Sequence, residues 1–303
     1  MPPGRPPDPA IAASMRAVRL LRRGGPEALA LEQIATPSPR VGEALVRVHA
    51  AAITRDELEW PVDRLPAIPS YELSGVVAAL GQGAESVAIG EPVYALIGFD
   101  RDGAAADYTA VPAALLAPKP RTLGHIESAA VPLAALSAWQ GLFDHGGLRK
   151  GQRVLIHGAA GGVGQFATQL AHEHGAYVIG TTSQVDRARE LKADEAIDDS
   201  ATPFEDAIDP VDLVFDTVGG ERLTRSAAVL RPGGRIVSVA EEADGVLYFV
   251  VEPNRDQLAE IGRLADTGRV GVAIDQVFSL DDAPAAFARV AEPGTRGKVV
   301  LAP

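Results

Sequence analysis

The stretch Arg153-Val-Leu-Ile-His-Gly-Ala-Ala-Gly-Gly-Val-Gly164 runs from an apolar segment directly into a cluster of glycines. Residues 153–157 predict a β-strand and residues 162–174 predict a helix, so the glycines form the turn between them. Such a turn leaves backbone N–H groups free at the positive end of a helix, and this geometry holds a diphosphate. The residues expected to bind a dinucleotide here are Ala160, Gly161, Gly162 and Val163.

The turn departs from the usual Gly-x-Gly-x-x-Gly pattern because Ala159 stands in its first position. Gly161 would let the backbone approach the phosphates, and Gly164 would let the helix pack close to the strand. A glycine cluster alone also occurs in plain tight turns. The position after a strand and before a helix is therefore what favours a dinucleotide site.

Apolar strands alternate with helices along this half of the chain, which is typical of a doubly wound parallel sheet. Strands are expected at residues 153–157, 177–181, 195–197, 211–216, 235–239 and 246–251, with helices at 162–174, 186–192, 221–230 and 256–267. Earlier, short apolar runs broken by Gly and Pro predict a β-rich domain, with strands at 44–48, 75–80, 93–97 and 108–111. Residues 276–280 and 298–301 return to strand character and are expected to complete that domain. Residues 126–145 predict a helix kinked at Pro132.

Length and composition suit two packed domains, because the chain has 303 residues, 47% of them hydrophobic. We expect a disordered leader at 1–14, a first domain at 15–120 and 252–303, and a dinucleotide-binding domain at 121–251. The net charge of -12 argues against nucleic-acid binding and against docking on anionic membranes. The sequence has no cysteine, no apolar run of about 18 residues and no secretory signal pattern. These features favour a cytoplasmic protein.

The end of the second strand indicates which dinucleotide binds. An NAD site carries Asp or Glu about 20 residues after the glycine turn, to hold the ribose 2′-hydroxyl. Here the sequence is Gly180-Thr-Thr-Ser183, followed by Arg187 and Arg189. The hydroxyls of Thr182 and Ser183 together with Arg187 suit a 2′-phosphate, so the pattern predicts NADPH. The alternative is an ordinary helix start with Ser183 as its N-cap, and both interpretations are compatible.

The ordered motifs of the chain resemble the zinc-free quinone oxidoreductase branch of the medium-chain dehydrogenase/reductase superfamily. The resemblance runs from Met15 to the C-terminus. It rests on the glycine turn and on six further motifs: Met15-Arg-Ala-Val18, Gly24-Gly-Pro-Glu27, Val131-Pro-Leu-Ala-Ala-Leu-Ser-Ala-Trp139, Phe215-Asp-Thr-Val-Gly-Gly220, Leu230-Arg-Pro-Gly-Gly234 and Thr295-Arg-Gly-Lys298. The resemblance implies an α/β protein with a GroES-like β-barrel domain, a Rossmann domain and an active site in the cleft between them.

The resemblance also makes zinc binding unexpected. Zinc-dependent relatives use a cysteine and the histidine of a Gly-His-Glu motif, and a separate lobe carries four more cysteines. This chain lacks cysteine and has Ser70-Tyr71-Glu72 in place of Gly-His-Glu. None of its six histidines is assigned to a metal, and His157 is expected to be a packed, hydrogen-bonded residue.

Without a metal, groups of the barrel domain would have to stabilise the charge that develops on a reduced acceptor. The resemblance points to Tyr71 and Thr54 as candidate catalytic donors, and to Trp60 and Leu133 as candidate substrate-binding residues. Each has a structural alternative: Tyr71 as a core tyrosine, Thr54 as a turn cap and Trp60 as a packing anchor. The loop from Trp60 to Ser70 is shorter than in similar family members, so substrate size stays open.

On the cofactor side, Asp216 and Val218 follow a strand at its carboxyl end, where ligands bind in open α/β sheets. The family pattern implies that Phe249 and Val250 pack near the nicotinamide. It also implies that Arg296 and Lys298 approach the cofactor phosphates, the alternative being a solvated basic edge strand. The apolar segment 246–251 is a strand that relatives pair across a two-fold axis, so a homodimer is expected.

These observations predict an NADPH-dependent, zinc-independent oxidoreductase that transfers a hydride to a small-molecule quinone or α,β-unsaturated carbonyl. Two alternatives stay open. One is a tailoring enoyl or ketone reductase of secondary metabolism, and the other is a non-catalytic NADPH-binding sensor, because fold alone does not decide function.

Overall fold

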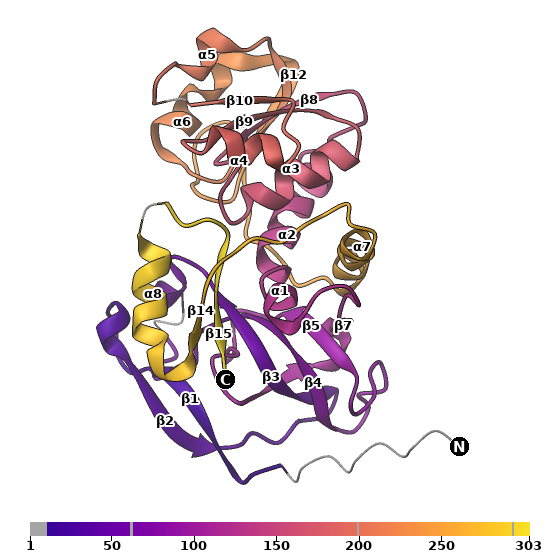
Figure 1. Ribbon diagram of the computed structural model, residues 1–303, viewed down its shortest axis with the longest axis vertical. Helices are drawn as coiled ribbons and strands as arrows, with labels where there is room; N and C mark the ends of the chain where they lie inside the picture. Colours follow the sequence, from indigo (N-terminus) through magenta and orange to yellow (C-terminus); the bar gives the residue numbers. More distant parts are fainter. Residues whose placement is uncertain (1–10, 61–62, 199, 293) are drawn as a thin grey trace. The chain divides into compact units, whose positions relative to one another are not determined.

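The computed structural model describes residues 11–60, 63–198, 200–292 and 294–303. Two compact units divide the chain (Figure 1). Unit 1 comprises Met1–Ala130, Gln276–Pro293 and Val299–Pro303, and unit 2 comprises Val131–Asp275 and Gly294–Lys298. The predicted leader falls mostly on residues outside the described ranges, and Ser14, its last residue, already begins a strand.

The unit boundaries differ from the expected ones at both ends of the second domain. Helix α1 (His125–Ala129) packs on strands of unit 1, so residues 121–130 belong there. Helix α7 (Arg255–Asp266) packs on α2 (Pro132–Trp139), which places residues 252–275 in unit 2. Side-chain packing between segments far apart in sequence sets these boundaries, and the local pattern does not reveal it.

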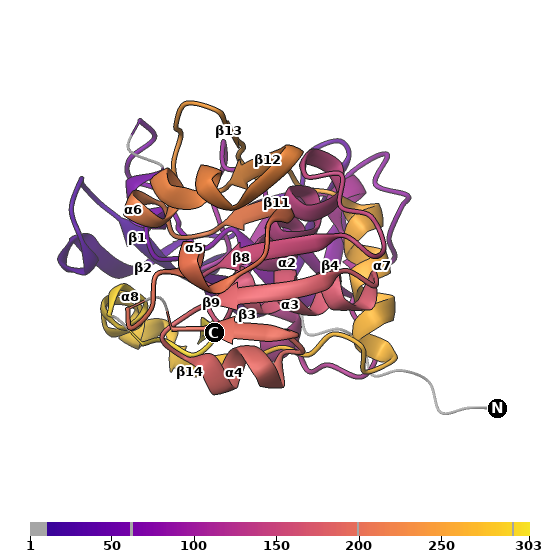
Figure 2. The ribbon, with the colours of Figure 1, turned by 90° about the horizontal axis from the view of Figure 1, so that it is seen from above.

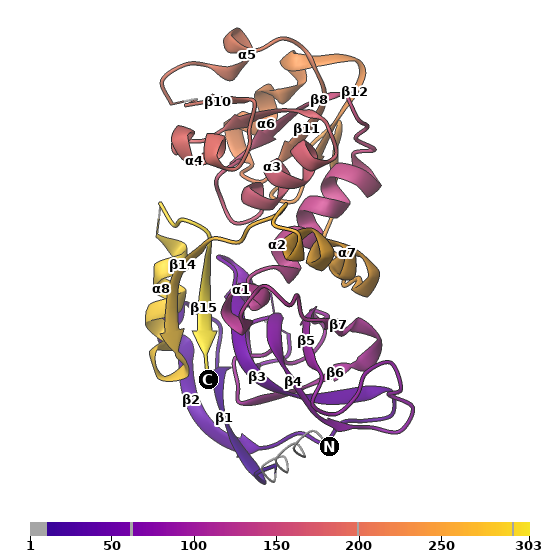
Figure 3. The same cartoon turned by 45° about the vertical axis from the view of Figure 1, so that its right-hand side comes forward.

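Unit 1 is built from antiparallel strands. Strands β1 (Ser14–Leu20) and β2 (Leu29–Ala35) form a two-stranded sheet. A larger sheet has the order β14-β15-β3-β4-β5-β7, with β6 also paired to β3. Its strands are β3 (Glu43–Ile53), β4 (Glu72–Leu80), β5 (Pro92–Leu96), β6 (Tyr108–Pro112), β7 (Ala117–Pro118), β14 (Ile274–Ser279) and β15 (Lys298–Ala302). The C-terminal strand β15 runs antiparallel to β3, as Figure 3 shows, so the tail completes this unit as expected.

Unit 2 contains a six-stranded parallel sheet in the order β10-β9-β8-β11-β12-β13 (Figure 2). The strands are β8 (Arg153–His157), β9 (Tyr177–Thr181), β10 (Glu195–Ile197), β11 (Val211–Asp216), β12 (Leu230–Ser238) and β13 (Val246–Tyr248). Numbered from β8, this is the 3-2-1-4-5-6 order of a dinucleotide-binding sheet, with its switch point between β8 and β11. The prediction of a doubly wound α/β domain is confirmed.

Helices connect these strands. Those of unit 2 also include α3 (Gly164–Glu173), α4 (Val185–Glu190), α5 (Phe204–Ala207) and α6 (Gly220–Arg225), while α8 (Ala283–Ala291) belongs to unit 1. Shorter turns are η1 (Pro26–Ala28), η2 (Glu57–Glu59), η3 (Ala113–Leu115), the π-helical η4 (Gln140–His145), η5 (Ser226–Val229) and η6 (Leu280–Asp282). Among the described residues, no helix has the length and apolar character needed to span a bilayer.

The helix predicted at 126–145 and the strand predicted at 246–251 both differ from the observed elements. Pro132 does not kink one continuous helix but occupies the first turn of α2, where a missing N–H costs nothing. Strand β13 covers only residues 246–248, and Phe249 then turns its N–H to the carbonyl of Ser238. The apolar character of 249–251 therefore reflects side-chain burial at Phe249 and Val251 and does not reflect strand pairing.

Candidate functional site

The glycine turn of unit 2 is shaped by two positions that admit no side chain. Gly158 has φ of 73°, and a β-carbon there would stand 2.7 Å from Thr217 Oγ1. A β-carbon at Gly164 would stand 2.0 Å from the carbonyl oxygen of Gly158, so this glycine does allow close packing of α3. The tight-turn role therefore lies at Gly158, one residue before the position examined in the sequence pattern.

The outer face of the turn is open and rich in donors. A β-carbon at Gly162 would meet only the side chain of Lys298, at 3.8 Å, and one at Gly161 only the carbonyl oxygen of Gly158, at 3.2 Å. Within the described ranges, the backbone N–H groups of Ala160, Gly162 and Val163 have no acceptor. These donors at the start of the ten-residue helix α3 fit a diphosphate.

Lys298 is brought to this turn from the far end of the chain. Its side chain is only 6% exposed, and its Cδ atom lies 3.8 Å from the β-carbon position of Gly162. Its backbone N–H donates to the carbonyl of Ala273 at 3.0 Å. The alternative of a solvated basic edge is thus wrong for Lys298. Arg296, by contrast, is exposed, and its backbone N–H donates to Asp275 at 2.8 Å.

At the end of β9, Thr182 and Ser183 lie where the sequence predicted adenosine recognition. The hydroxyl of Thr182 accepts a hydrogen bond from the backbone N–H of Gln184 at 3.0 Å, and Ser183 is exposed. Helix α4 has Gln184 as its N-cap and no side-chain cap, so the N-cap interpretation of Ser183 is wrong. The Arg187 guanidinium pairs with Glu190 on its own helix at 3.1 Å.

One buried polar atom beside these residues lacks a partner among the described residues: the Oε1 atom of Gln184. An unsatisfied buried amide oxygen is costly, and a ligand group is one way to satisfy it. The residue was not singled out from the sequence, because a glutamine before a helix carries no specific signal.

His157, at the end of β8, is fully buried as expected. Its Nε2 atom lies 2.9 Å from Ser226 Oγ, which itself donates to the carbonyl of Arg222. Nε2 therefore carries the proton, and Thr181 donates to Nδ1 at 2.9 Å. This bonding explains how a histidine is accommodated in the core.

Asp216 is also fully buried, at the carboxyl end of β11. Its carboxylate accepts hydrogen bonds from the backbone N–H groups of Val218 and Gly219 and from Ser238 Oγ at 2.7 Å. It thus shapes the loop that follows the strand, and Val218 stands on that loop with 46% of its surface exposed.

The two residues predicted to pack near a nicotinamide differ in their surroundings. Phe249 is buried, with its ring 4.3 Å from that of His145, whereas Val250 is 59% exposed. Leu133, a predicted substrate residue in α2, is buried as well.

In unit 1, Tyr71 lies at the centre of an aromatic cluster. Its ring centroid is 5.8 Å from that of Trp60 and 5.3 Å from that of Phe99, and the last two rings meet edge to face at 5.1 Å. Tyr71 is fully buried, and burial raises the pKa of its hydroxyl to about 12. The hydroxyl lies 3.3 Å from Arg64 Nη2, which donates to it and also to the carbonyl of Phe99 at 2.8 Å.

Glu57 is a buried acid that sequence reasoning missed. One carboxylate oxygen accepts from the backbone N–H of Thr54 at 2.9 Å, and the other from that of Ser70 at 2.8 Å. Ser70 has φ of 71°, a conformation that favours glycine, at the place where zinc-dependent relatives carry the glycine of Gly-His-Glu. Glu57 therefore holds the backbone around Tyr71, while Thr54 itself stays partly exposed.

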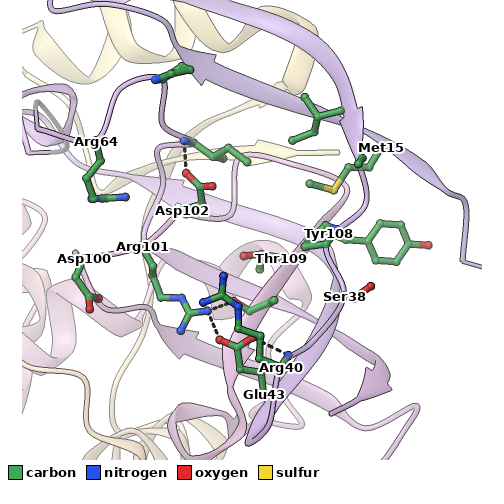
Figure 4. Close-up of a pocket in the computed structure, with 17 residues that line it drawn as sticks. Met15, Ser38, Arg40, Glu43, Arg64, Asp100, Arg101, Asp102, Tyr108 and Thr109 are labelled. Carbon is green, nitrogen blue, oxygen red and sulfur yellow. Dashed lines mark hydrogen bonds and ion pairs between the residues drawn. The ribbon is translucent and has the colours of Figure 1, made fainter.

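A cavity of about 640 Å³ also lies in unit 1 (Figure 4). Arg101 and Glu43, which both line it, form an ion pair with 2.6 Å between Nη2 and Oε1, and Asp102 accepts from the backbone N–H of Ile68. Arg64 lines the same cavity. Because these charges are largely matched within the protein, the cavity does not define a ligand class.

Among the described residues, no group of three or more His, Asp or Glu side chains is arranged to hold a metal ion. His49 and His125 do stack, with ring centroids 4.4 Å apart. His125 Nδ1 lies 2.8 Å from Ser74 Oγ, and burial together with His49 lowers the pKa of His125 to about 4.

Comparison with known proteins connects both units to one group of enzymes. Residues 40–121 match the alcohol dehydrogenase GroES-like domain, and residues 191–301 match the zinc-binding dehydrogenase family. The chain is 33% identical to a 2-methylene-furan-3-one reductase of Solanum lycopersicum, over 97% of this chain and 80% of that protein. It is 31% identical to a chloroplastic NADPH-dependent alkenal/one oxidoreductase of Arabidopsis thaliana, over 98% and 81%. The structure of a quinone oxidoreductase from Coxiella burnetii superposes with a TM-score of 0.90 at 30% identity, over 96% and 99%.

Proposed function

This chain belongs to the medium-chain dehydrogenase/reductase superfamily, and we propose that it is an NADPH-dependent, zinc-independent oxidoreductase that reduces a conjugated carbonyl compound or a quinone. The observation that carries the proposal is the glycine turn with Lys298 beside it. The names of the tomato, Arabidopsis and Coxiella relatives support the acceptor class.

The residues present fit a pyridine dinucleotide. The free backbone N–H groups of Ala160, Gly162 and Val163 would hold its diphosphate, and Lys298 would supply a positive charge there. When bound, NADPH supplies a hydride to the acceptor. Arg296, Phe249 and Val250 are proposed to line the same site, and Asp216 is proposed to act by shaping the loop that presents Val218.

NADPH is preferred over NADH in this proposal because the end of β9 offers hydroxyls and a guanidinium. Thr182 and Ser183 lie there without a carboxylate at the strand tip, and Arg187 stands one turn further on. Arg187 pairs with Glu190 through Nη1, and this partly exposed pair costs little to break when the guanidinium turns toward a 2′-phosphate. The buried Oε1 atom of Gln184 marks a further polar contact for the adenosine end.

Residues of unit 1 are proposed to donate the proton to the reduced acceptor and to stabilise its negative charge. Thr54 is proposed as the donor, because it is partly exposed and its backbone is held by Glu57. Tyr71 stands in place of the zinc-binding histidine, which supports zinc independence together with the absence of cysteine. Its buried hydroxyl supports a packing role, with Trp60 covering it and offering an aromatic surface to a flat acceptor. Leu133 is proposed to line the acceptor site.

We also propose a homodimer formed through β13. This strand lies at the edge of the parallel sheet, and Leu247 and Tyr248 are 42% and 40% exposed on it. An apolar edge strand favours pairing with a second copy. Light scattering of the wild type and of Leu247→Lys tests this: a dimer that the substitution dissociates is expected, and a wild-type monomer would contradict it.

Three measurements test the function. The zinc content of the purified protein is determined, and its affinities for NADPH and NADH are measured by calorimetry. Oxidation of NADPH is then followed with quinones, enones and enoyl thioesters. We expect tighter binding of NADPH, turnover with enones or quinones, and no stoichiometric zinc. Equal affinity for both cofactors would remove the NADPH preference. Tight binding without oxidation of NADPH by any acceptor would instead indicate a sensor.

A further inference from the structure

Gln165 links the glycine turn to the segment that carries Lys298. Its side chain is 1% exposed on the first turn of α3. Its Nε2 atom donates to the carbonyl of Gly162 at 3.3 Å, and its Oε1 atom accepts from the backbone N–H of Ala273 at 2.9 Å. Because that N–H requires an oxygen, the orientation of the amide group follows from its partners.

Ala273 is in turn hydrogen-bonded to Lys298. The carbonyl of Ala273 accepts the backbone N–H of Lys298 at 3.0 Å, and Gly297 has φ of 109° with its β-carbon position 2.1 Å from the same carbonyl oxygen. The side chain of Lys298 then returns to Gly162. A closed ring of contacts therefore joins four residues of unit 2: Gly162, Gln165, Ala273 and Lys298.

We propose that Gln165 is a positioning residue that sets the spacing between the donors of the glycine turn and the ammonium group of Lys298, and so determines the affinity for the diphosphate of the cofactor. The inference rests on the proposed function of the turn. It follows from geometry: without Gln165, the turn and the 271–273 segment lose a side chain that hydrogen-bonds to both.

Gln169, one helical turn further along α3, provides a matched control. Its Oε1 atom accepts from the backbone N–H of Gly271 at 2.7 Å, and its Nε2 atom donates to the carbonyls of Gly271 and Gln165. It is similarly buried and hydrogen-bonded to the same segment, but among the described residues its side chain makes no hydrogen bond to the glycine turn. Loss of Gln169 should therefore cost stability without changing the turn.

The first test is amide hydrogen exchange of the protein without added nucleotide, comparing the wild type with Gln165→Leu and Gln169→Leu. We expect Gln165→Leu to accelerate exchange at Gly161 and at Lys298 together. Gln169→Leu should accelerate exchange at Gly271 and leave Gly161 unchanged. If exchange at Gly161 is the same in Gln165→Leu as in the wild type, the proposed coupling does not exist, whatever the protein binds.

The second test is calorimetry of the same three proteins with NADPH and with adenosine 2′-monophosphate, which lacks the diphosphate. Gln165→Leu should weaken NADPH about tenfold and leave the monophosphate unchanged, while Gln169→Leu should leave both within about twofold. Equal weakening by both substitutions would reduce Gln165 to a structural role and overturn the proposal. A wild type that binds neither ligand would overturn the proposed function itself, even where the exchange result supports the coupling.

Discussion

The Cδ atom of Lys298 lies 3.8 Å from the point where a β-carbon would stand at Gly162, so a methyl group fits there in ordinary van der Waals contact. Gly164 offers no such room, because its β-carbon position is 2.0 Å from the carbonyl oxygen of Gly158. Gly164 is therefore required by close packing within the protein, whereas Gly162 is not. Substituting each glycine by alanine distinguishes the two cases.

Gly162→Ala should fold normally and lower cofactor affinity. The added methyl group meets no protein atom closely, so we expect the free energy of unfolding to change by less than about 1 kcal/mol. It would, however, occupy the face where the turn is proposed to meet a diphosphate. Urea unfolding and NADPH calorimetry on the same sample check both parts, and unchanged affinity would place the diphosphate elsewhere.

Gly164→Ala should instead lower stability. A β-carbon at this position must push apart α3 and the turn, at a cost of about 1–3 kcal/mol. Denaturant unfolding measures the loss, with Gly162→Ala as the control for a new methyl group in the same turn. Equal stability of the two variants would show that the close approach at Gly164 does not constrain the turn.

Lys298→Met should weaken NADPH about tenfold, roughly 1.4 kcal/mol, because it keeps the buried stem and removes the charge. The salt dependence of NADPH binding should fall as well, since charge interactions are screened over about 10 Å at 0.1 M salt. Titrations at low and high salt measure both effects. Arg149→Met is the control, because Arg149 is an exposed arginine of unit 2 outside the proposed cofactor site. An equal loss of affinity there would indicate a general effect of positive charge and not a contact at the turn.

Tyr71→Phe should retain turnover, and its free energy of unfolding should depend less on pH in the alkaline range. The folded-state pKa of Tyr71 is raised to about 12, so its contribution is fully present below the ordinary value near 10 and is lost as pH rises from 10 to 12. Phenylalanine removes this part of the alkaline decline in the free energy of unfolding. Thr54→Val is expected to lower kcat in the same assay. A large fall of kcat in Tyr71→Phe alone would make Tyr71 the donor.

His125 should make unit 1 sensitive to acid. Its folded-state pKa is lowered to about 4, so the neutral ring contributes stability that is present above about pH 6.5 and is lost as pH falls toward 4. His125→Gln should flatten the decline of the unfolding free energy across this window, because it leaves His49 without a second cation. Unfolding measured at several pH values between 7 and 4 tests the slope, and a slope equal to that of the wild type would assign the acid sensitivity to other groups.

Local chemistry determined much of this protein. The 153–164 stretch predicts strand, turn and helix because glycine and apolar spacing act over a few residues, and the alternation that follows predicts the parallel sheet, which the structure confirms. The ordered motifs led to the family, which comparison with known proteins shows. The turn glycines and the hydroxyls after β9 were likewise visible as candidates.

Tertiary structure alone decided which of these candidates meet. Arg64 bonds to Phe99 and Tyr71, Glu57 joins Thr54 to Ser70, and Lys298 reaches a turn formed by residues 158–164. The extent of β13 and the unit boundaries were also set this way. Such contacts depend on how separate loops and strands pack together in three dimensions. Packing and buried hydrogen bonding therefore select them, and the local pattern of one sequence does not reveal which will form.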